Sequence, residues 1–444
     1  MGRLPYSMKL LQLLAIVSAP AIFTVVALAQ SGEPASTPAE TSPASAPAAP
    51  AAPAAETVKA PPPFTLGRTA GNKEGKSPYA TDSQLGRPPS VYVIPMEGYM
   101  GVDIHPLVYD KIIADVKAKK PDIIVFRLNS SDGRMNEKYM EAVNEASKDD
   151  KINPRRLASG ITDYRDLAAK LHNEFASIPC VMYVQDSRGI SSVYALAWPY
   201  MFMAPDARIA GLDIVASLGG GNDADIKAKM FSAWTGIAKG ILELGGRSQE
   251  LCDAVVRPDR KLSADIDGRA TKWRADTLGS WYVIDQSDEA AARFSAKSAE
   301  DTGLSDGIAY DMADLLYLLG YPEFTMIDSG EKIYRDTNTA WRKRYAESKK
   351  MMEDFQQEME GPQDLGKRKQ ILEKMRQLFK QYPQLARMWE WTRGLTDDQL
   401  KVLIEQLGEQ IRTYQKQKQG TTGGGKGGGK GGGRGGPAGP MGPG

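Results

Sequence analysis

Ser191 combines the residue type and the setting that a serine nucleophile needs. It follows a polar loop, and the residues after it predict a short helix that stops by Pro199, because proline disfavours helix at and before its own position. A serine nucleophile needs a base that accepts its proton and N–H donors that face the developing oxyanion, and a helix N-terminus supplies such donors. Serine is also a common N-cap without any catalytic role. The sequence leaves both roles open.

The base that would activate this serine is not a histidine. The chain contains 2 histidines, His105 and His172, and both precede the serine, so we expect them to be ordinary structural or surface residues. A lysine can serve instead if burial lowers its pKa and keeps it neutral. Lys227 and Lys229 lie on a helix predicted from about Asp223 to Leu244, roughly 160° apart at about 100° per residue. Only one of them can face the serine.

The two lysines differ in the residues that share their helix face. Lys229 shares a face with the small residues Ala233, Gly236 and Gly240. Lys227 shares one with the larger apolar residues Met230 and Phe231. The alternative for either lysine is an ordinary solvated charge on a helix.

Strands alternate with helices along the segment that must position these residues. Apolar strands are predicted at Val91–Pro95, Asp122–Leu128, Pro179–Val184 and Tyr200–Ala204, with an amphipathic helix at Pro106–Lys119. The second strand is apolar almost throughout, which is typical of a strand buried on both faces. This alternation predicts an α/β domain with a parallel sheet. The later segment from Lys261 to Ile284 predicts a hairpin extension of that domain.

Four short segments in this order resemble blocks of the ClpP/crotonase-fold serine peptidases of the signal-peptide-peptidase and NfeD type. The segments are Leu128–Gly133, Gly189–Tyr194, Met203–Ala207 and Phe294–Ile308. The resemblance implies an α/β fold, with a ClpP/crotonase-like core of repeated ββα units and a C-terminal helical appendage.

The same resemblance implies roles for individual residues. Ser191 would be the nucleophile and Lys229 the base, with Lys227 as competitor, and the backbone N–H groups of Gly133 and Ser192 would form the oxyanion hole. The activity implied is that of an ATP-independent serine endopeptidase acting on peptides or unfolded proteins. No cofactor and no metal are implied, and we expect a homo-oligomer.

Two departures from the family pattern bear on activity. Asp132 puts a carboxylate into the loop where the family has Pro-Gly-Gly, and Ser192-Val193 replaces two small residues after the nucleophile. A catalytically inactive scaffold or binding protein with the same fold is therefore the alternative function. Acyl-CoA chemistry of the crotonase type ranks third, because export would separate the protein from its substrate and no acid/base carboxylate is placed.

Composition divides the chain into five segments, 1–29, 30–87, 88–320, 321–419 and 420–444. Arg3 and Lys9 precede an apolar run to Ala29, which predicts a signal peptide or, alternatively, a membrane anchor that could associate the protein with a membrane. An Ala/Pro-rich tether follows, then the core, a helical domain and a disordered Gly-rich tail. We expect an exported protein of the periplasm or cell envelope.

The charge balance and the cysteine count argue against two further classes of protein, nucleic-acid binders that act through bulk charge and disulfide-rich proteins. The chain has 56 Lys+Arg against 55 Asp+Glu, so bulk charge predicts no nucleic-acid binding. Two cysteines, Cys180 and Cys252, do not make a disulfide framework, and Cys180 lies in an apolar strand where a free thiol is expected.

The helical domain carries two apolar stripes at helical spacing. They consist of Trp341, Tyr345, Met352, Phe355 and Met359, and of Leu400, Ile404, Leu407, Ile411 and Tyr414. We interpret them as intramolecular packing, with a coiled-coil arm for oligomers or partners as the alternative. Thr396 and Gln399 predict a capping box at the start of the last helix.

Overall fold

The structure is a computed structural model of the 444-residue chain. It describes residues 76–80, 87–131, 161–212, 224–268, 270–285, 290–360 and 364–422. The predicted signal segment, most of the tether, Asp132, Gly133 and the Gly-rich tail from residue 423 lie outside these ranges, so what the sequence predicts of them stays a prediction. Residues 420–422, predicted to belong to the disordered tail, are the last residues of a helix.

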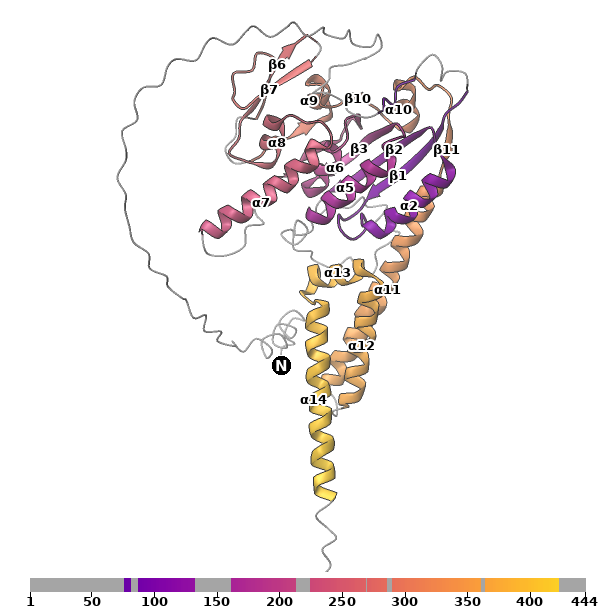
Figure 1. Cartoon of the computed structure of the whole chain (residues 1–444), viewed down its shortest axis with the longest axis vertical. Helices are drawn as coiled ribbons and strands as arrows, with labels where there is room; N and C mark the ends of the chain where they lie inside the picture. Colours follow the sequence, from indigo (N-terminus) through magenta and orange to yellow (C-terminus); the bar gives the residue numbers. More distant parts are fainter. Residues whose placement is uncertain are drawn as a thin grey trace, which may run out of the picture. The chain divides into compact units, whose positions relative to one another are not determined.

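A largely parallel sheet forms the centre of the protein (Figure 1). Its strand order is β10-β4-β3-β2-β1-β11, and every pair along this path is parallel. The strands are β1 (Ser90–Glu97), β2 (Ile123–Ser131), β3 (Cys180–Arg188), β4 (Met201–Met203), β10 (Gly307–Ile308) and β11 (Thr325–Ile327). The short strand β5 (Arg208–Ala210) also pairs with β3, and β9 (Phe294–Ser295) pairs antiparallel with β5. The predicted α/β class and parallel sheet are confirmed.

The sheet is buried on both faces because its strands are apolar on both. Tyr92 and Phe126 belong to one hydrophobic cluster, while Val91 and Val125 belong to another, as the two-residue period of a strand requires. The first cluster is covered by α2 (Pro106–Lys119), α5 (Ile161–Phe175) and α6 (Ser192–Leu196). The second is covered by α10 (Met312–Leu318). Burial on both faces explains the unbroken apolar runs in the sequence.

A smaller antiparallel sheet follows two helices in the second half of the core. Helix α7 (Ala224–Glu243) and α8 (Gln249–Val256) lead into β6 (Leu262–Asp267), β7 (Ala270–Arg274) and β8 (Tyr282–Asp285). Strand β6 is central and pairs antiparallel with both neighbours, so the predicted hairpin is part of a three-stranded sheet. Helix α9 (Ala296–Asp301) then leads back to β10.

Four helices follow the last strand of the main sheet. They are α11 (Ser329–Glu360), α12 (Leu365–Gln381), α13 (Pro383–Arg393) and α14 (Asp397–Thr422), and we call them the arm. Thr396 and Gln399 exchange hydrogen bonds between side chain and backbone N–H, 3.0 and 3.2 Å long, which confirms the capping box. Core and arm belong to one compact unit of the chain.

The predicted stripes of the arm are buried only in part. Trp341 and Tyr345 are 1% exposed and Leu400 is fully buried, whereas Met359 and Tyr414 are 40% and 64% exposed. Of the helices that the structure describes, none has the length and apolar character needed to cross a membrane.

Candidate functional site

The candidate site lies where β2 and β3 end at the carboxyl edge of the sheet. These strands pair as far as Ser131 and Arg188, and the chain then turns through a single 3-10 turn, Gly189–Ser191, into α6. Gly189 has a φ of +76°, which only glycine adopts readily. A side chain at Gly211 would come within 2.8 Å of the Gly189 nitrogen, so this turn is tightly packed against the end of β5.

Ser191 is completely buried, and its hydroxyl is already used. Its Oγ donates to the carbonyl oxygens of Ser130, at 2.6 Å, and Arg188, at 3.0 Å. A hydroxyl has one proton to donate, so both contacts share it. Ser191 is the N-terminal flanking residue of α6, but its side chain caps no N–H group there. The side chain therefore satisfies strand-end carbonyls, a role that the sequence analysis did not consider.

Three other buried serines make similar bonds around Ser191. We call these four residues, Ser130, Ser187, Ser191 and Ser192, the serine cluster. Each of them is at most 3% exposed. The Oγ of Ser130 donates to Gly98 O at 2.6 Å, and that of Ser187 contacts the Oγ of Ser192 at 3.0 Å. The serine cluster thus joins the ends of β2 and β3 to the neighbouring loops.

Of the two predicted oxyanion donors, the structure describes Ser192. The backbone N–H of Ser192 points into the preceding turn, toward the carbonyls of Gly189 and Ile190. Its hydroxyl bonds to Ala210 O at 3.1 Å and to Ser187 O at 3.2 Å. Gly133, the other predicted donor, lies outside the described residues.

The structure does not bring Lys229 to Ser191. Lys229 is exposed on α7, on a face where Ala233 and Gly236 are exposed too, whereas Ser191 is fully buried. Both residues are described, and no hydrogen bond joins them.

The competitor Lys227 occupies the other face of the same helix. It precedes the fully buried Ala238 by eleven residues, which is three helical turns, so the two positions lie along one side of α7. Near position 227 this side includes the exposed Met230 and the half-buried Phe231. The side chain of Lys227 is outside the described part of the chain.

A buried arginine fixes the other end of α6. Arg247 donates to the carbonyl oxygens of Trp198, at 2.7 Å, and Leu196, at 3.2 Å, just after the helix. Cations are favourable at a helix C-terminus, where carbonyls lack partners. Burial lowers the pKa of Arg247 to about 10. Even so, it stays charged at neutral pH and holds α6 in place.

A charged pair beside the serine cluster was missed from the sequence. Asp186 and Arg188, near the end of β3, approach to 3.5 Å between Oδ1 and Nε. Their geometry is poor for a hydrogen bond, and these two buried atoms have no other hydrogen-bond partner among the described residues. The polar run that follows the apolar part of this strand is the signal that could have indicated them.

The two histidines have structural roles, as predicted. His105 caps α2, with its Nδ1 accepting a hydrogen bond from Leu107 N at 3.3 Å, and burial lowers its pKa to about 4. His172 stacks on Trp198 with ring centroids 4.0 Å apart, and its Nε2 lies 2.7 Å from Ala197 O. Neither histidine contacts Ser191.

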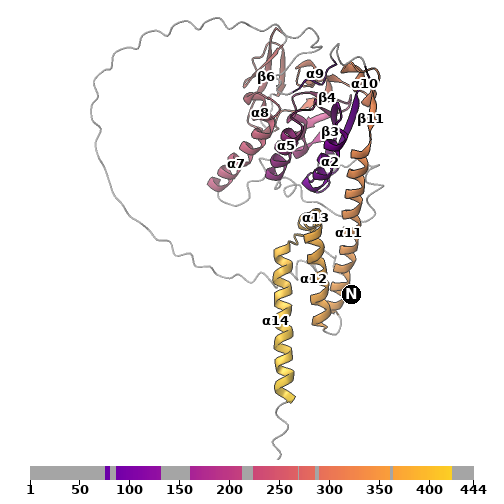
Figure 2. The same ribbon diagram turned by 45° about the vertical axis from the view of Figure 1, so that its right-hand side comes forward.

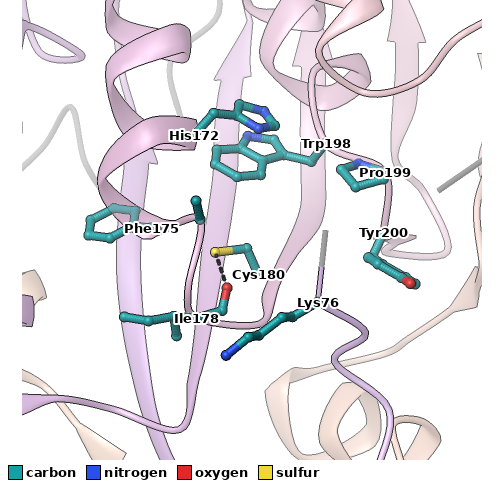
Figure 3. Close-up of a pocket in the computed structure, with 9 residues that line it drawn as sticks. Lys76, His172, Phe175, Ile178, Cys180, Trp198, Pro199 and Tyr200 are labelled. Atoms are coloured by element: carbon teal, nitrogen blue, oxygen red, sulfur yellow. Dashed lines mark hydrogen bonds between the residues drawn. The ribbon is translucent and has the colours of Figure 1, made fainter. Parts of the chain in front are cut away.

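The pocket that Figure 3 shows lies away from this site. His172, Trp198, Tyr200 and Cys180 are among its lining residues, and its volume is about 50 Å³. Cys180 is the first residue of β3 and the serine cluster is at the other end, roughly 26 Å along the strand at about 3.3 Å per residue. Burial raises the pKa of the Cys180 thiol, and both cysteines are free. The pocket therefore supplies no nucleophile to the serine site.

Comparisons with known proteins give weak matches to one protease. No family model matches the sequence, and no curated protein matches it. A mutant of the 1510-N membrane-bound stomatin-specific protease is 14% identical, with a TM-score of 0.31, over 52% of this chain and 85% of that one.

Two further structures of this kind are similar. A second mutant, in complex with a substrate peptide, is 15% identical over 51% of this chain and 78% of that one, with a TM-score of 0.30. The 1510-N membrane protease specific for a stomatin homolog from Pyrococcus horikoshii is 16% identical over 36% of this chain and 72% of that one, with a TM-score of 0.18. The fold of this chain is therefore assigned from the pairing of its own strands.

Within the described ranges, no three His, Cys, Asp or Glu side chains converge in a way that could hold a metal ion. Of the groups described, the serine site contains hydroxyls, backbone carbonyls and one ion pair.

Proposed function

We propose that this protein is a non-catalytic scaffold or binding protein with a ClpP/crotonase-like core. The observation that carries the proposal is the hydrogen bonding of the Ser191 hydroxyl, whose Oγ lies 2.6 Å from the carbonyl oxygen of Ser130 and 3.0 Å from that of Arg188. A nucleophilic serine must present its proton to a base and its oxygen to the substrate. Here the residue is fully buried, and the partners of its hydroxyl among the described residues are these two carbonyls.

The exposure of Lys229, the lysine expected to act as the base, supports the same proposal. A lysine base has to lose its charge, which burial in an apolar site would favour. Lys229 is exposed, so its surroundings provide no such burial. Ser130 and Ser192 likewise donate to backbone carbonyls, and Ser187 donates to the Ser192 hydroxyl. A substrate would have to displace several of these bonds at once.

The second candidate is the ATP-independent serine endopeptidase. It is favoured by one observation, namely that Ser191 stands at the start of α6 beside the carboxyl ends of β2 and β3, where α/β proteins place their chemistry. In this candidate the serine hydroxyl leaves its carbonyl partners when substrate binds, and a lysine of α7 takes the proton. Lys229 is then the expected base, with Lys227 as its competitor.

Labelling with a serine-directed fluorophosphonate separates the two candidates. The wild-type chain is compared with Ser191→Ala, Lys227→Met and Lys229→Met, and with Ser232→Ala as control, because Ser232 is exposed on α7. The scaffold proposal expects no labelling that depends on Ser191 and no cleavage of unfolded casein. Labelling lost only in Ser191→Ala, together with casein cleavage, overturns the scaffold and establishes the peptidase. The lysine variant that then abolishes cleavage identifies the base.

The location and assembly of the protein are part of the proposal. The apolar run that ends at Ala29 supports export to the periplasm or cell envelope, with membrane attachment if it is retained. Partners would be peptides or proteins, and a homo-oligomer is expected. Fractionation of cells expressing the full chain, with the mass of the exported protein, distinguishes a cleaved signal peptide from an anchor. A full-length chain in the cytosolic fraction would contradict export.

A further inference from the structure

A short segment before the first strand is fastened to the core although it belongs to no helix or strand. It consists of Lys76–Ala80, and we call it the strap. Pro78 is buried, and Tyr79 and Ala80 pack against the hydrophobic cluster on the second face of the sheet. Strand β4 and helix α10 contribute to the same cluster, and Figure 2 shows these two elements close together. The strap therefore docks on this side of the core through three consecutive residues.

Tyr79 gives the strap its specific contacts. Its ring meets the ring of Tyr200 edge to face, with the two centroids 6.1 Å apart. Its hydroxyl is hydrogen-bonded to Asp306, and burial together with this carboxylate raises the pKa of Tyr79. The hydroxyl thus keeps its proton and stays a donor. An aromatic pair and a hydrogen bond together are strong enough to change the opening equilibrium of a docked segment by about tenfold or more.

The turn after α10 leaves room for the end of the strap. The Ala80 N–H donates to Leu319 O at 2.8 Å. Gly320 has a φ of +91°, and a side chain at this position would come within 2.9 Å of the Ala80 Cβ. The strap can approach this turn because glycine has no side chain.

The strap also forms part of the wall of the pocket in Figure 3. Lys76 lines this pocket, and so does Tyr200, against which Tyr79 packs. Figure 3 shows the Lys76 side chain across the pocket from His172. Cys180 lines the pocket too, and it is half-buried. A movement of the strap would therefore change the access of solvent to the Cys180 thiol.

We propose that the strap is a lid, which closes the Cys180 pocket while Tyr79 is docked and opens it on release without unfolding the core. The strap is outside every helix and strand, so its release breaks the contacts of Tyr79 and Ala80 but no hydrogen bond of the main sheet. Segments held by few contacts open at a lower free energy than the strands of a core. Toward the N-terminus the chain continues into the predicted tether, so a pull on the tether acts on the lid first.

The rate at which N-ethylmaleimide modifies Cys180 measures the opening of the lid. The purified full chain is labelled at about pH 8, and the two cysteines are quantified separately by peptide mass mapping. When the lid opens and closes quickly, this rate is proportional to the open population. We expect Tyr79→Ala to raise the Cys180 rate by about tenfold or more, and Tyr79→Phe, which keeps the ring contact, to raise it by about threefold.

Tyr310→Ala is the matched control for these variants. Tyr310 follows β10 directly before α10, and its side chain is 78% exposed. Its removal should change the Cys180 rate by less than about twofold. An equal rise in this variant would mean that the loss of any tyrosine near α10 has the same effect, and it would contradict the role of Tyr79.

Cys252 shows whether a variant opens the lid or unfolds the core. It is fully buried in α8 and is not among the residues that line the pocket. Faster labelling of Cys180 alone in Tyr79→Ala supports the lid. An equal rise for both cysteines would indicate unfolding of the core, and an unchanged Cys180 rate would show that the strap does not close the pocket. Either result overturns the proposal. The serine cluster is at the other end of β3, so the outcome is independent of whether Ser191 is catalytic.

Discussion

The hydrogen bonds of the Ser191 hydroxyl indicate which role this residue has in the candidate site. Serine at the start of a helix suggests either a nucleophile or an N-cap, and the sequence cannot distinguish these from a third role. In the structure the Ser191 proton satisfies two carbonyls at the ends of β2 and β3. Buried carbonyls need partners, so the residue contributes to stability in either candidate function.

Replacing Ser191 by alanine should therefore destabilise the fold. The change leaves the buried Ser130 carbonyl and the part-buried Arg188 carbonyl without this donor, and the expected cost is about 1–3 kcal/mol in the free energy of unfolding. Urea unfolding followed by circular dichroism measures it. Ser232→Ala, at an exposed position of α7, should cost less than about 0.5 kcal/mol. Equal stability of both variants would mean that the Ser191 hydroxyl is free to do other work.

Protonation of His105 should weaken the fold in mild acid. Burial and the nearby Arg387 lower its pKa to about 4, while Asp163 and Asp110 oppose this. The unfolded chain takes up the proton near pH 6.5, so the contribution of His105 is complete above that pH and is lost as the pH falls toward 4. The free energy of unfolding should fall by about 3 kcal/mol, as the difference between the two pKa values requires. The protonated ring also cannot accept the hydrogen bond from Leu107 N.

Urea unfolding between pH 7.5 and 4 tests this prediction. The variant His105→Asn keeps a capping side chain at the start of α2 but has no titration in this range. The slope of stability against pH should therefore be shallower in the variant than in the wild type. Identical slopes would show that other groups control the acid sensitivity.

At the scale of elements, the strands were predictable and the faces of the helices were not. Long apolar runs such as Asp122–Leu128 are strands in the structure because a parallel sheet buries both of their faces. For α7 the choice between Lys227 and Lys229 depended on which face packs on the core, and both faces contain small or apolar residues. Ala238 and Ile241 are buried and Gly236 is not, which shows the packed face only for the C-terminal half of α7. The orientation of a helix face depends on tertiary packing, which helical periodicity does not contain.

The arm holds the loop that borders the site. Arg342 of α11 makes a two-pronged ion pair with Asp103, at 2.5 and 3.1 Å, and the two side chains are 4% and 0% exposed. Asp103 also accepts a hydrogen bond from Tyr99 N at 2.9 Å. The same loop contains Gly98, whose carbonyl accepts from Ser130. Contacts of the arm thus reach the serine cluster through one loop.

Breaking this pair from one side should be costly. Arg342→Met leaves the Asp103 carboxylate buried without its cation, and the expected loss is about 3–5 kcal/mol in the free energy of unfolding. The double variant Arg342→Met/Asp103→Leu should recover part of the loss, because no buried charge remains. Arg344→Met is the control, since its partner Glu347 is exposed and the pair is worth less than about 1 kcal/mol. A loss of that small size in Arg342→Met would mean that the pair is not buried in solution.

On the scale of the whole molecule, the boundary between core and arm is less clear than composition suggests. The sequence changes character after Tyr321, yet β11 lies beyond that point and pairs with β1 through Thr325 and Met326. Short edge strands such as this one carry too little pattern to be seen in a sequence. Arg342 and Arg387, which lie well inside the arm, also donate to Asp103 and to Gly101 O in the loop after β1. The core therefore depends on residues of the arm.

A chain that ends at Gly320 should therefore fail to fold like the full protein. Such a truncation leaves the outer edge of β1 unpaired and removes the cation that balances Asp103, so two unfavourable features arise together. The expected result is an aggregation-prone product, or a thermal midpoint lower than that of residues 76–422 by more than about 10 °C, given several kcal/mol lost. Differential scanning calorimetry and gel filtration of the two chains measure this. Equal midpoints would show that 88–320 is an independent domain, as the composition alone predicts, and that the arm serves its partners rather than the core.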